Sequence, residues 1–225
     1  MKNKNIVALT GVSFAACALH YAWLQTPLTL YAYASALKCA LFLACPIMYF
    51  ALAGNGSLRS MFAGVSPKAA KLSFAAGLCV FALIWLLFFA ARPFLSAEAL
   101  GGAFGRRGIT EGNFIFVFLY IILINAALEE IFFRGFVFMT LCREGVKRFA
   151  HAYSCLLFAL YHAAILDNAV SPPLFALCMA GLAAAGLFFN ILTAKCGGIT
   201  ASLIVHVAAN AALNLIVAAY YLPPR

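Results

Sequence analysis

The chain has 225 residues, of which 66% are hydrophobic and 9% are charged, and its formal net charge is +9. Soluble globular domains carry about 25% charged residues, so this composition excludes that class and predicts a single membrane domain. The basic residues are scattered over short loops between apolar segments, which is typical of the positive-inside distribution. We therefore expect the lipid bilayer, and no nucleic acid, as a partner.

Seven apolar segments approach or exceed the roughly 20 residues that a membrane-spanning helix needs. In chain order they cover residues 6–24, 30–53, 70–91, 113–141, 151–166, 173–194 and 200–221. The fourth segment is long for one span, so it is either tilted or broken into two pieces. We predict an all-α polytopic helical bundle of seven, or eight, transmembrane helices. Residues 1–225 form one membrane domain, with N-terminal helices in 1–110 and a core in 113–215.

The loops between these segments differ in charge. Residues 92–112, which are rich in glycine and mixed in charge, are predicted to form the longest loop. With the N-terminus inside, most lysine and arginine residues of the loops fall on the inner side, so the positive-inside bias predicts a cytoplasmic N-terminus. The short chain without an accessory domain favours the inner membrane of a prokaryotic cell. No feature of the sequence predicts an oligomeric state.

The run from Asn125 to Arg134 carries two adjacent glutamates and an arginine inside an apolar segment. Each ionisable group at membrane depth costs roughly 2.5–3.5 kcal/mol on insertion scales, so a functional role is expected. Glu130 and Arg134 are four residues apart, with the acid first, which is the favourable order for an ion pair on a helix. We predict that this pair supports the site and is not the reacting group.

Glu129 points about 100° away from Glu130 on an α-helix and shares its face with Asn125. The residues three and four positions ahead of it are Phe132 and Phe133, which carry no charge. We therefore predict that Glu129 has no counter-ion. A desolvated carboxylate without a positive partner can take up and release a proton near neutral pH.

Two later segments add histidines, in Phe158-Ala-Leu-Tyr-His162 and in His206-Val-Ala-Ala-Asn210. A single histidine on an apolar helix is more often a structural hydrogen-bonding group than a catalyst. With a rise of about 1.5 Å per residue, however, both histidines and Asn210 reach depths comparable to that of Glu129. We expect the four side chains to meet in the middle or inner part of the membrane.

This set of side chains predicts hydrolysis. Glu129 and His162 can hold and deprotonate a water molecule, and Glu129 can return the proton to the leaving amine. His206 and Asn210 can donate hydrogen bonds to the oxyanion of a tetrahedral intermediate. Glutamate and histidine could instead hold a zinc ion, although no H-E-x-x-H motif is present. We expect no metal and no cofactor, with zinc as the alternative.

The motifs Glu-Glu-x-x-x-Arg, Phe-x-x-x-His and His-x-x-x-Asn, in this order on successive membrane helices, resemble the CPBP family. These CAAX proteases and bacteriocin-processing enzymes, also called the ABI family, are intramembrane glutamic endopeptidases and include the type II CAAX prenyl endopeptidases. The motifs lie at residues 129–134, 158–162 and 206–210, and the resemblance covers about residues 113–215. Each motif is short, but the three in order are specific.

The resemblance implies a role for each motif position. It implies that Glu129 is the catalytic base, that His162 is its partner on the water, and that His206 and Asn210 form the oxyanion site. It implies a less direct role for Glu130 and Arg134, packing for Phe158, and a mechanism without a metal. The expected substrate is a membrane-associated peptide or protein: a prenylated tail, a bacteriocin or pheromone precursor, or a C-terminal sorting tail.

Two functions outside proteolysis stay open. A proton-coupled transporter also uses buried glutamate and histidine, but it commonly shows inverted repeats or broken helices in both halves. Here the polar motifs lie in the C-terminal half of the chain. A non-catalytic membrane scaffold or immunity protein would keep the same fold but would not need every polar group.

Overall fold

The computed structural model describes residues 2–26, 30–53, 57–62, 64–166 and 170–221, and long helices dominate it. Six of them are uninterrupted α-helices: α1 (Lys2–Leu24), α2 (Tyr31–Ala53), α3 (Pro67–Ala91), α8 (Lys147–Leu166), α9 (Pro172–Cys196) and α10 (Thr200–Tyr220). The seventh runs from Phe114 to Arg143. Each apolar segment of the sequence therefore forms one long helix, and the predicted all-α bundle is confirmed.

The outer surface of the bundle is suited to lipid. Six of the described helical segments are long and apolar enough to cross a membrane, and α8 is the long helix outside that group. Large apolar side chains such as Leu72, Leu86 and Phe116 point outward and are exposed. Together these features describe an integral, multi-pass membrane protein.

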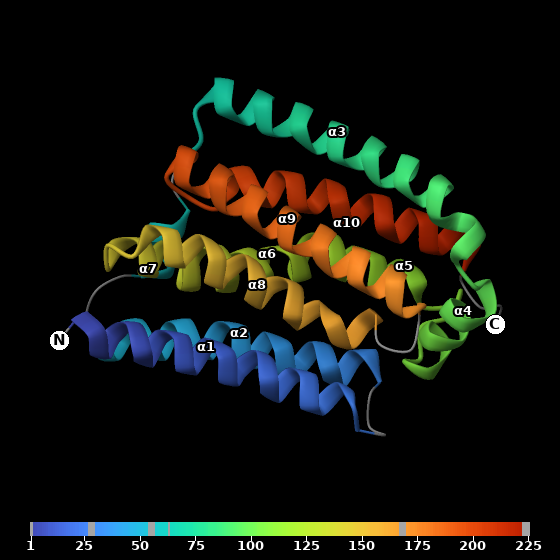
Figure 1. The fold of residues 1–225 in the computed structure, drawn as a ribbon, viewed down its shortest axis with the longest axis horizontal. Coiled ribbons are helices and arrows are strands. Elements are labelled where there is room, and N and C mark those ends of the chain that lie inside the picture. The colour runs from blue at the N-terminus through green and yellow to red at the C-terminus, as the bar shows by residue number, and fades with distance from the viewer. Residues whose placement is uncertain (1, 27–29, 54–56, 63, 167–169, 222–225) are drawn as a thin grey trace.

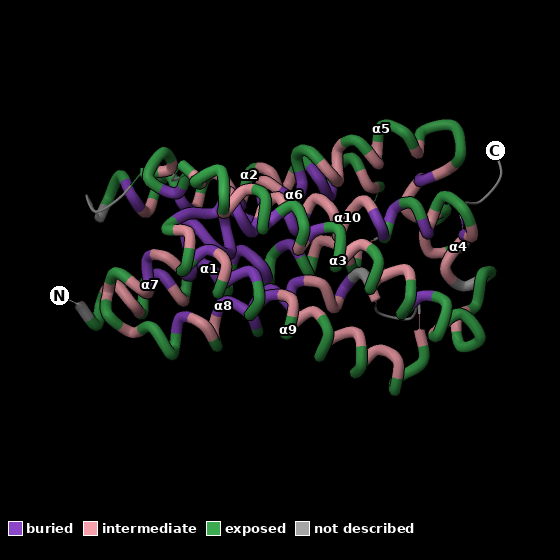
Figure 2. The backbone as a smooth tube through the Cα atoms, turned by 90° about the horizontal axis from the view of Figure 1, so that it is seen from above, coloured by how far each residue is buried: buried purple, intermediate pink, exposed green. Residues whose placement is uncertain are grey.

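The helices are arranged in successive layers (Figure 1). The pair α1 and α2 lies at one side and α3 at the other, with α8, α9, α10 and the Phe114–Arg143 segment between them. Helix α3 packs along α10, and α8 packs along α9. Figure 2 shows that buried residues concentrate toward the middle of this arrangement, where the motif-bearing helices lie.

The Phe114–Arg143 segment is continuous, so of the two predicted alternatives, a tilted helix or a helix broken into two pieces, the break is absent. It contains α5 (Phe114–Leu119), η3 (Tyr120–Asn125), α6 (Ala126–Glu129), η4 (Glu130–Met139) and α7 (Thr140–Arg143). Both η3 and η4 are π-helical, with i→i+5 hydrogen bonds. The π-helix is rare in proteins, and where it does occur it is often found at a functional site. Glu129 and Glu130 lie at the junction between α6 and η4.

Residues 92–112 do not form the predicted loop. They contain the short 3₁₀ turn η2 (Arg92–Phe94) and the helix α4 (Ala97–Arg106). Glycine-rich composition favoured a loop, but the apolar residues Leu95, Leu100 and Phe104 pack against Phe88 and Tyr221. This tertiary packing compensates for the weak helix propensity of the glycines.

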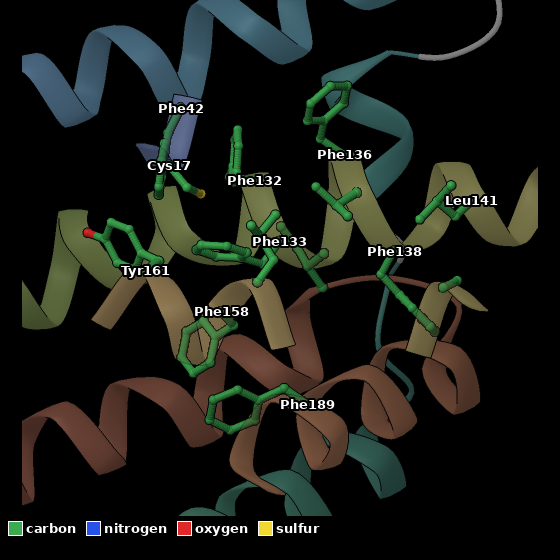
Figure 3. Packing of buried hydrophobic residues seen from close by; sticks show 14 of the residues in the cluster. Cys17, Phe42, Phe132, Phe133, Phe136, Phe138, Leu141, Phe158, Tyr161 and Phe189 are labelled. Atoms are coloured by element: carbon green, nitrogen blue, oxygen red, sulfur yellow. The ribbon is translucent and has the colours of Figure 1, made fainter. Parts of the chain in front are cut away.

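Aromatic side chains fill the core around the Phe114–Arg143 segment. The Phe42 ring of α2 stacks on Phe132 with 4.1 Å between ring centres, and it meets Phe133 edge-on. Phe133 in turn meets Phe158 of α8 edge-on (Figure 3). Three helices are thus joined through a continuous set of rings, and this set supports the polar motifs beside it.

The two ends of the bundle carry different charge. The N-terminus of α1, the turn η1 (Leu58–Met61) and the α7–α8 connection share one end, where Asn5 bonds Glu144 and Arg143 bonds Ser60. Several basic residues belong to the helix termini and turns at this end, among them Lys4, Arg59, Arg143 and Lys147, whereas Arg92, Arg106 and Arg107 lie at the opposite end around α4. This distribution agrees with a cytoplasmic N-terminus, which stays a prediction.

Close packing between α8 and α9 depends on one glycine. A Cβ atom at Gly186 would lie 3.0 Å from the Cα atom of Cys155 and 3.3 Å from the Phe158 ring. Gly181 on the same helix is exposed, and a Cβ atom there would meet nothing within 4 Å. Close packing of α8 on α9 therefore requires a glycine at position 186 and does not require one at position 181.

We predict that Gly186→Ala destabilises the protein because the backbones of α8 and α9 must separate. Overpacking of this kind costs about 1–3 kcal/mol. The matched variant Gly181→Ala should be neutral or slightly stabilising, since alanine has the higher helix propensity. Thermal unfolding of both purified variants in the same detergent, followed by circular dichroism, measures the difference. Equal transition temperatures for the two variants would contradict the prediction.

Candidate active site

The predicted ion pair between Glu130 and Arg134 is present in the core. Nη1 of Arg134 lies 3.3 Å from Oε1 of Glu130, and neither side chain has any solvent exposure. The guanidinium carbon lies 4.2 Å from the ring centre of Phe158 and 4.8 Å from that of Phe189. These cation–π contacts add to the carboxylate in compensating the buried charge. Phe158 therefore packs directly on the supporting arginine.

His206 connects the two glutamates. Its Nδ1 atom lies 2.9 Å from Oε1 of Glu130, and its Nε2 atom lies 3.5 Å from Oε2 of Glu129. The Ser202 hydroxyl donates a second hydrogen bond to Glu130 at 2.5 Å. A carboxylate that pairs with an arginine accepts hydrogen bonds, so Nδ1 of His206 carries the hydrogen. In the neutral imidazole, Nε2 is then a proton acceptor that faces Glu129.

His162 faces Glu129 in the same manner. Its Nδ1 atom lies 2.8 Å from the carbonyl oxygen of Phe158. A carbonyl oxygen can only accept, so this bond places the hydrogen on Nδ1 and leaves Nε2 as the acceptor. That Nε2 atom lies 3.7 Å from Oε2 of Glu129. Two imidazoles from different helices therefore present the same kind of atom to one carboxylate oxygen.

The two oxygens of Glu129 have different surroundings. Oε1 accepts hydrogen bonds from Asn125 at 2.9 Å and from the Tyr161 hydroxyl at 3.4 Å. Oε2 faces the two imidazoles and has no hydrogen-bond partner among the described residues. The side chain is 3% exposed, so the group is buried at the centre of the bundle. One oxygen holds the carboxylate in place and the other is presented for chemistry.

The prediction that Glu129 has no counter-ion is wrong. Lys38 of α2 reaches the site, and its ammonium nitrogen lies 3.8 Å from Oε1 of Glu129. The same ammonium donates a hydrogen bond to the Asn125 side chain. Helix-face arithmetic considers only neighbours within one helix, so it could not find a partner from another. A lysine inside the apolar segment 30–53 was itself an indication, because charged residues at membrane depth are rare.

Asn210 lies one turn beyond His206 on α10. Its side-chain nitrogen donates to the carbonyl oxygen of Ile121 at 3.3 Å, in the π-helical η3. It makes no hydrogen bond with Glu129, His162 or His206, all of which lie within the described residues. The structure thus brings three of the four candidate residues together, and the oxyanion role of Asn210 stays a prediction.

The cluster of Glu129, His162 and His206 is a group of proton acceptors. Among the described residues, no group of three or more His, Cys, Asp or Glu side chains is arranged to hold a metal ion. Oε2 of Glu129 and the two imidazole Nε2 atoms are proton acceptors that face one another. Such acceptors are stabilised by a shared proton or by a donor such as water. The arrangement is therefore suited to binding and deprotonating a small donor.

Comparison with known families agrees with the motifs. Residues 111–212 match the family model described as type II CAAX prenyl endopeptidase, Rce1-like. The matched range contains all three motifs and nearly coincides with the core expected at 113–215, so the resemblance to the CPBP family is confirmed. The match supports a membrane protease of the CAAX type. No curated protein and no solved structure gives a significant match to the chain.

We predict that Arg134→Met destabilises the protein strongly, because it leaves the Glu130 carboxylate buried without its arginine. Breaking one side of a buried ion pair costs about 3–5 kcal/mol. Replacing both members, in Glu130→Gln with Arg134→Met, should recover much of that loss. Unfolding of the three proteins in mixed micelles with increasing denaturing detergent gives the comparison. A single variant as stable as the wild type would contradict the structural role of the pair.

Proposed function

We propose that this protein, whose residues 111–212 match the Rce1-like CAAX prenyl endopeptidases, is a glutamic endopeptidase acting within or at the edge of the membrane. The proposal rests on the convergence of Oε2 of Glu129 with the Nε2 atoms of His162 and His206. The three acceptors come from three separate helical segments; Glu129 and His206 are buried and His162 is partly buried. A structural hydrogen bond pairs a donor with an acceptor, whereas these three atoms are all acceptors and cannot bond one another without an added proton or donor.

In the proposed reaction, a water molecule binds between Glu129 and His162. Glu129 accepts a proton from this water, and the hydroxide oxygen bonds to the carbonyl carbon of the peptide. The tetrahedral intermediate then collapses with breakage of the carbon–nitrogen bond. Glu129 returns its proton to the leaving nitrogen, so the products are a carboxylic acid and an amine and the site is restored.

His206 and Asn210 are the proposed oxyanion groups. In this scheme His206 takes up one proton from bulk water when the substrate binds and releases it with the products, so that during the reaction its Nε2 donates to the oxyanion while the Glu130 carboxylate on its Nδ1 stabilises the imidazolium. Asn210 shares the face of α10 with His206, and its amide would exchange the Ile121 carbonyl for the substrate oxygen. In this scheme Glu130 is a positioning residue, and Arg134 keeps Glu130 ionised.

The position of the cluster favours a substrate that is itself in the membrane. Glu129 precedes Arg143, at the end of the helix, by several helical turns. The scissile bond must therefore enter the bundle well below its surface. A lipid-linked or hydrophobic tail reaches this depth more readily than a soluble peptide, so we propose a membrane-associated peptide or protein as substrate.

We predict that Glu129→Gln abolishes cleavage of membrane-tethered peptides, because the amide cannot accept the proton from water. General-base catalysis contributes roughly 10²–10⁴-fold, so a loss of at least this size is expected. Glu144→Gln is the matched control, since Glu144 lies at the end of the bundle beside Asn5. Purified proteins in proteoliposomes are compared by mass spectrometry of the products. Full activity of Glu129→Gln would refute the mechanism.

Rigorous chelation is expected to leave cleavage by the wild type unchanged, because the proposed steps use only residues of this chain. The same proteoliposome assay is run after treatment with a strong zinc chelator and after readdition of zinc. Activity that disappears on chelation and returns with zinc would establish the zinc alternative. Proton-linked uptake without proteolysis would instead favour the transporter.

A further inference from the structure

A second group of polar side chains surrounds a cavity at the end of the bundle where the N-terminus of α1 lies. The cavity is formed where α7 and the start of α8 meet the end of α9 (Figure 1). Its volume of about 340 Å³ falls within the range of roughly 300–1,000 Å³ that is typical of small-molecule sites. Glu129, His162 and His206, all within the described residues, do not belong to its lining. The cavity is therefore separate from the proposed active site.

The polar wall of this cavity is cationic. Arg143 at the end of α7 and Lys147 at the start of α8 line it, and no acidic residue does so within the part of the chain that the structure describes. Glu144 lies between them in sequence but accepts a hydrogen bond from Asn5 of α1 at 3.4 Å. Neither Arg143 nor Lys147 forms an ion pair with a described residue. Both positive charges are therefore available to an anion.

The two basic side chains also have hydrogen-bond donors for such an anion. Nη2 of Arg143 donates to the Ser60 hydroxyl at 3.4 Å, and a guanidinium has further N–H donors in a fixed planar arrangement. The ammonium group of Lys147 has three donors and no acceptor. Arginine binds phosphate oxygens through two parallel bonds and lysine binds them as a point charge. The pair therefore matches a phosphate group.

His151 on α8 gives an independent indication of a ligand. It lines the cavity, yet its buried Nδ1 atom has no hydrogen-bond partner among the described residues. Its ring packs against that of Phe138 with 4.7 Å between ring centres, and its backbone carbonyl accepts a hydrogen bond from Asn190. Buried polar atoms almost always have a partner, and one without it requires an explanation. An oxygen atom of a ligand in the cavity can accept from this nitrogen.

Part of the cavity wall is apolar and continues onto the lipid-facing surface. Phe138, Met139 and Ala194 belong to this part. Ala194 is exposed, as are Ile191 and Leu187, and the spacing of three and four residues along α9 puts all three on one face of that helix. This apolar stripe leads from the cavity toward the middle of the membrane. It suits an acyl chain, whereas a free phosphate ion would make no use of it.

We propose that this cavity binds the headgroup of an anionic phospholipid, with the phosphate on Arg143 and Lys147 and an acyl chain along the apolar stripe of α9. Lysine and arginine at the ends of membrane helices lie at the level of the lipid headgroups. Basic pockets between such helices are suited to phosphorylated headgroups. The proposal does not depend on the peptidase function, because the proposed catalytic side chains lie outside the cavity.

Native mass spectrometry of the full-length protein in a non-ionic detergent tests the proposal. Phosphatidylglycerol and phosphatidylcholine with identical acyl chains are titrated separately at one ionic strength, and the apparent Kd of each lipid is measured. Both lipids contain a phosphate, but only phosphatidylglycerol has a net negative charge. We expect the wild type to bind phosphatidylglycerol roughly fivefold or more tightly than phosphatidylcholine, since each basic residue near the membrane surface contributes a factor of about this size.

Lys147→Gln should weaken the binding of phosphatidylglycerol about fivefold, because glutamine carries no charge. Combining it with Arg143→Gln should abolish the preference over phosphatidylcholine. Arg148→Gln is the matched control, since this exposed neighbour carries the same charge but does not line the cavity, and its affinity should stay that of the wild type. All three positions are exposed, so the variants are expected to fold, and circular dichroism verifies their helix content.

Equal affinities of the wild type for the two lipids would overturn the proposal. Equal losses in Lys147→Gln and Arg148→Gln would do so too, because they would indicate attraction by the overall surface charge and not a defined site. Inorganic phosphate that displaces phosphatidylglycerol at an equal concentration would overturn the assignment to a lipid, since the apolar stripe would then contribute nothing. No cleavage is measured, so the result is independent of the proposed peptidase function.

Discussion

The buried charge of Arg134 is the constraint on which the rest of the structure depends. A guanidinium without solvent exposure costs several kcal/mol unless other groups compensate its charge. Compensation comes from Glu130 on the same helix and from the rings of Phe158 and Phe189 on α8 and α9. Those helices must therefore close around the Phe114–Arg143 segment. Gly186 permits the close approach between them.

The same pair leads to the chemistry of the site. Because Arg134 keeps Glu130 as an acceptor, the hydrogen of His206 is held on Nδ1 and its Nε2 atom faces Glu129. Glu129 is in turn held through one oxygen by Asn125, Tyr161 and Lys38, which leaves the other oxygen for the imidazoles. The supporting pair and the proposed base are thus parts of one network rather than separate features.

Much of the site could be predicted from the sequence because polar residues are conspicuous in an apolar background. The Glu130–Arg134 pair and the Asn125–Glu129 contact follow from helical spacing, and both are present. Lys38 was not predicted as a partner of Glu129, since it lies on another helix and far away in sequence. Helix α4 was also missed, because its stability comes from packing against α3 and the C-terminal end of α10 and not from local propensity.

The sequence by itself determined that this is a helical membrane protein and placed its polar motifs in order along the chain, because hydropathy and motif order are properties of the linear chain. Only the tertiary structure decided the environment of each group. It assigned Lys38 and Tyr161 to one oxygen of Glu129 and the histidines to the other, and it turned Asn210 toward Ile121. These contacts join different helices, and their geometry depends on packing and on the π-helical turns, which residue spacing along one helix does not specify.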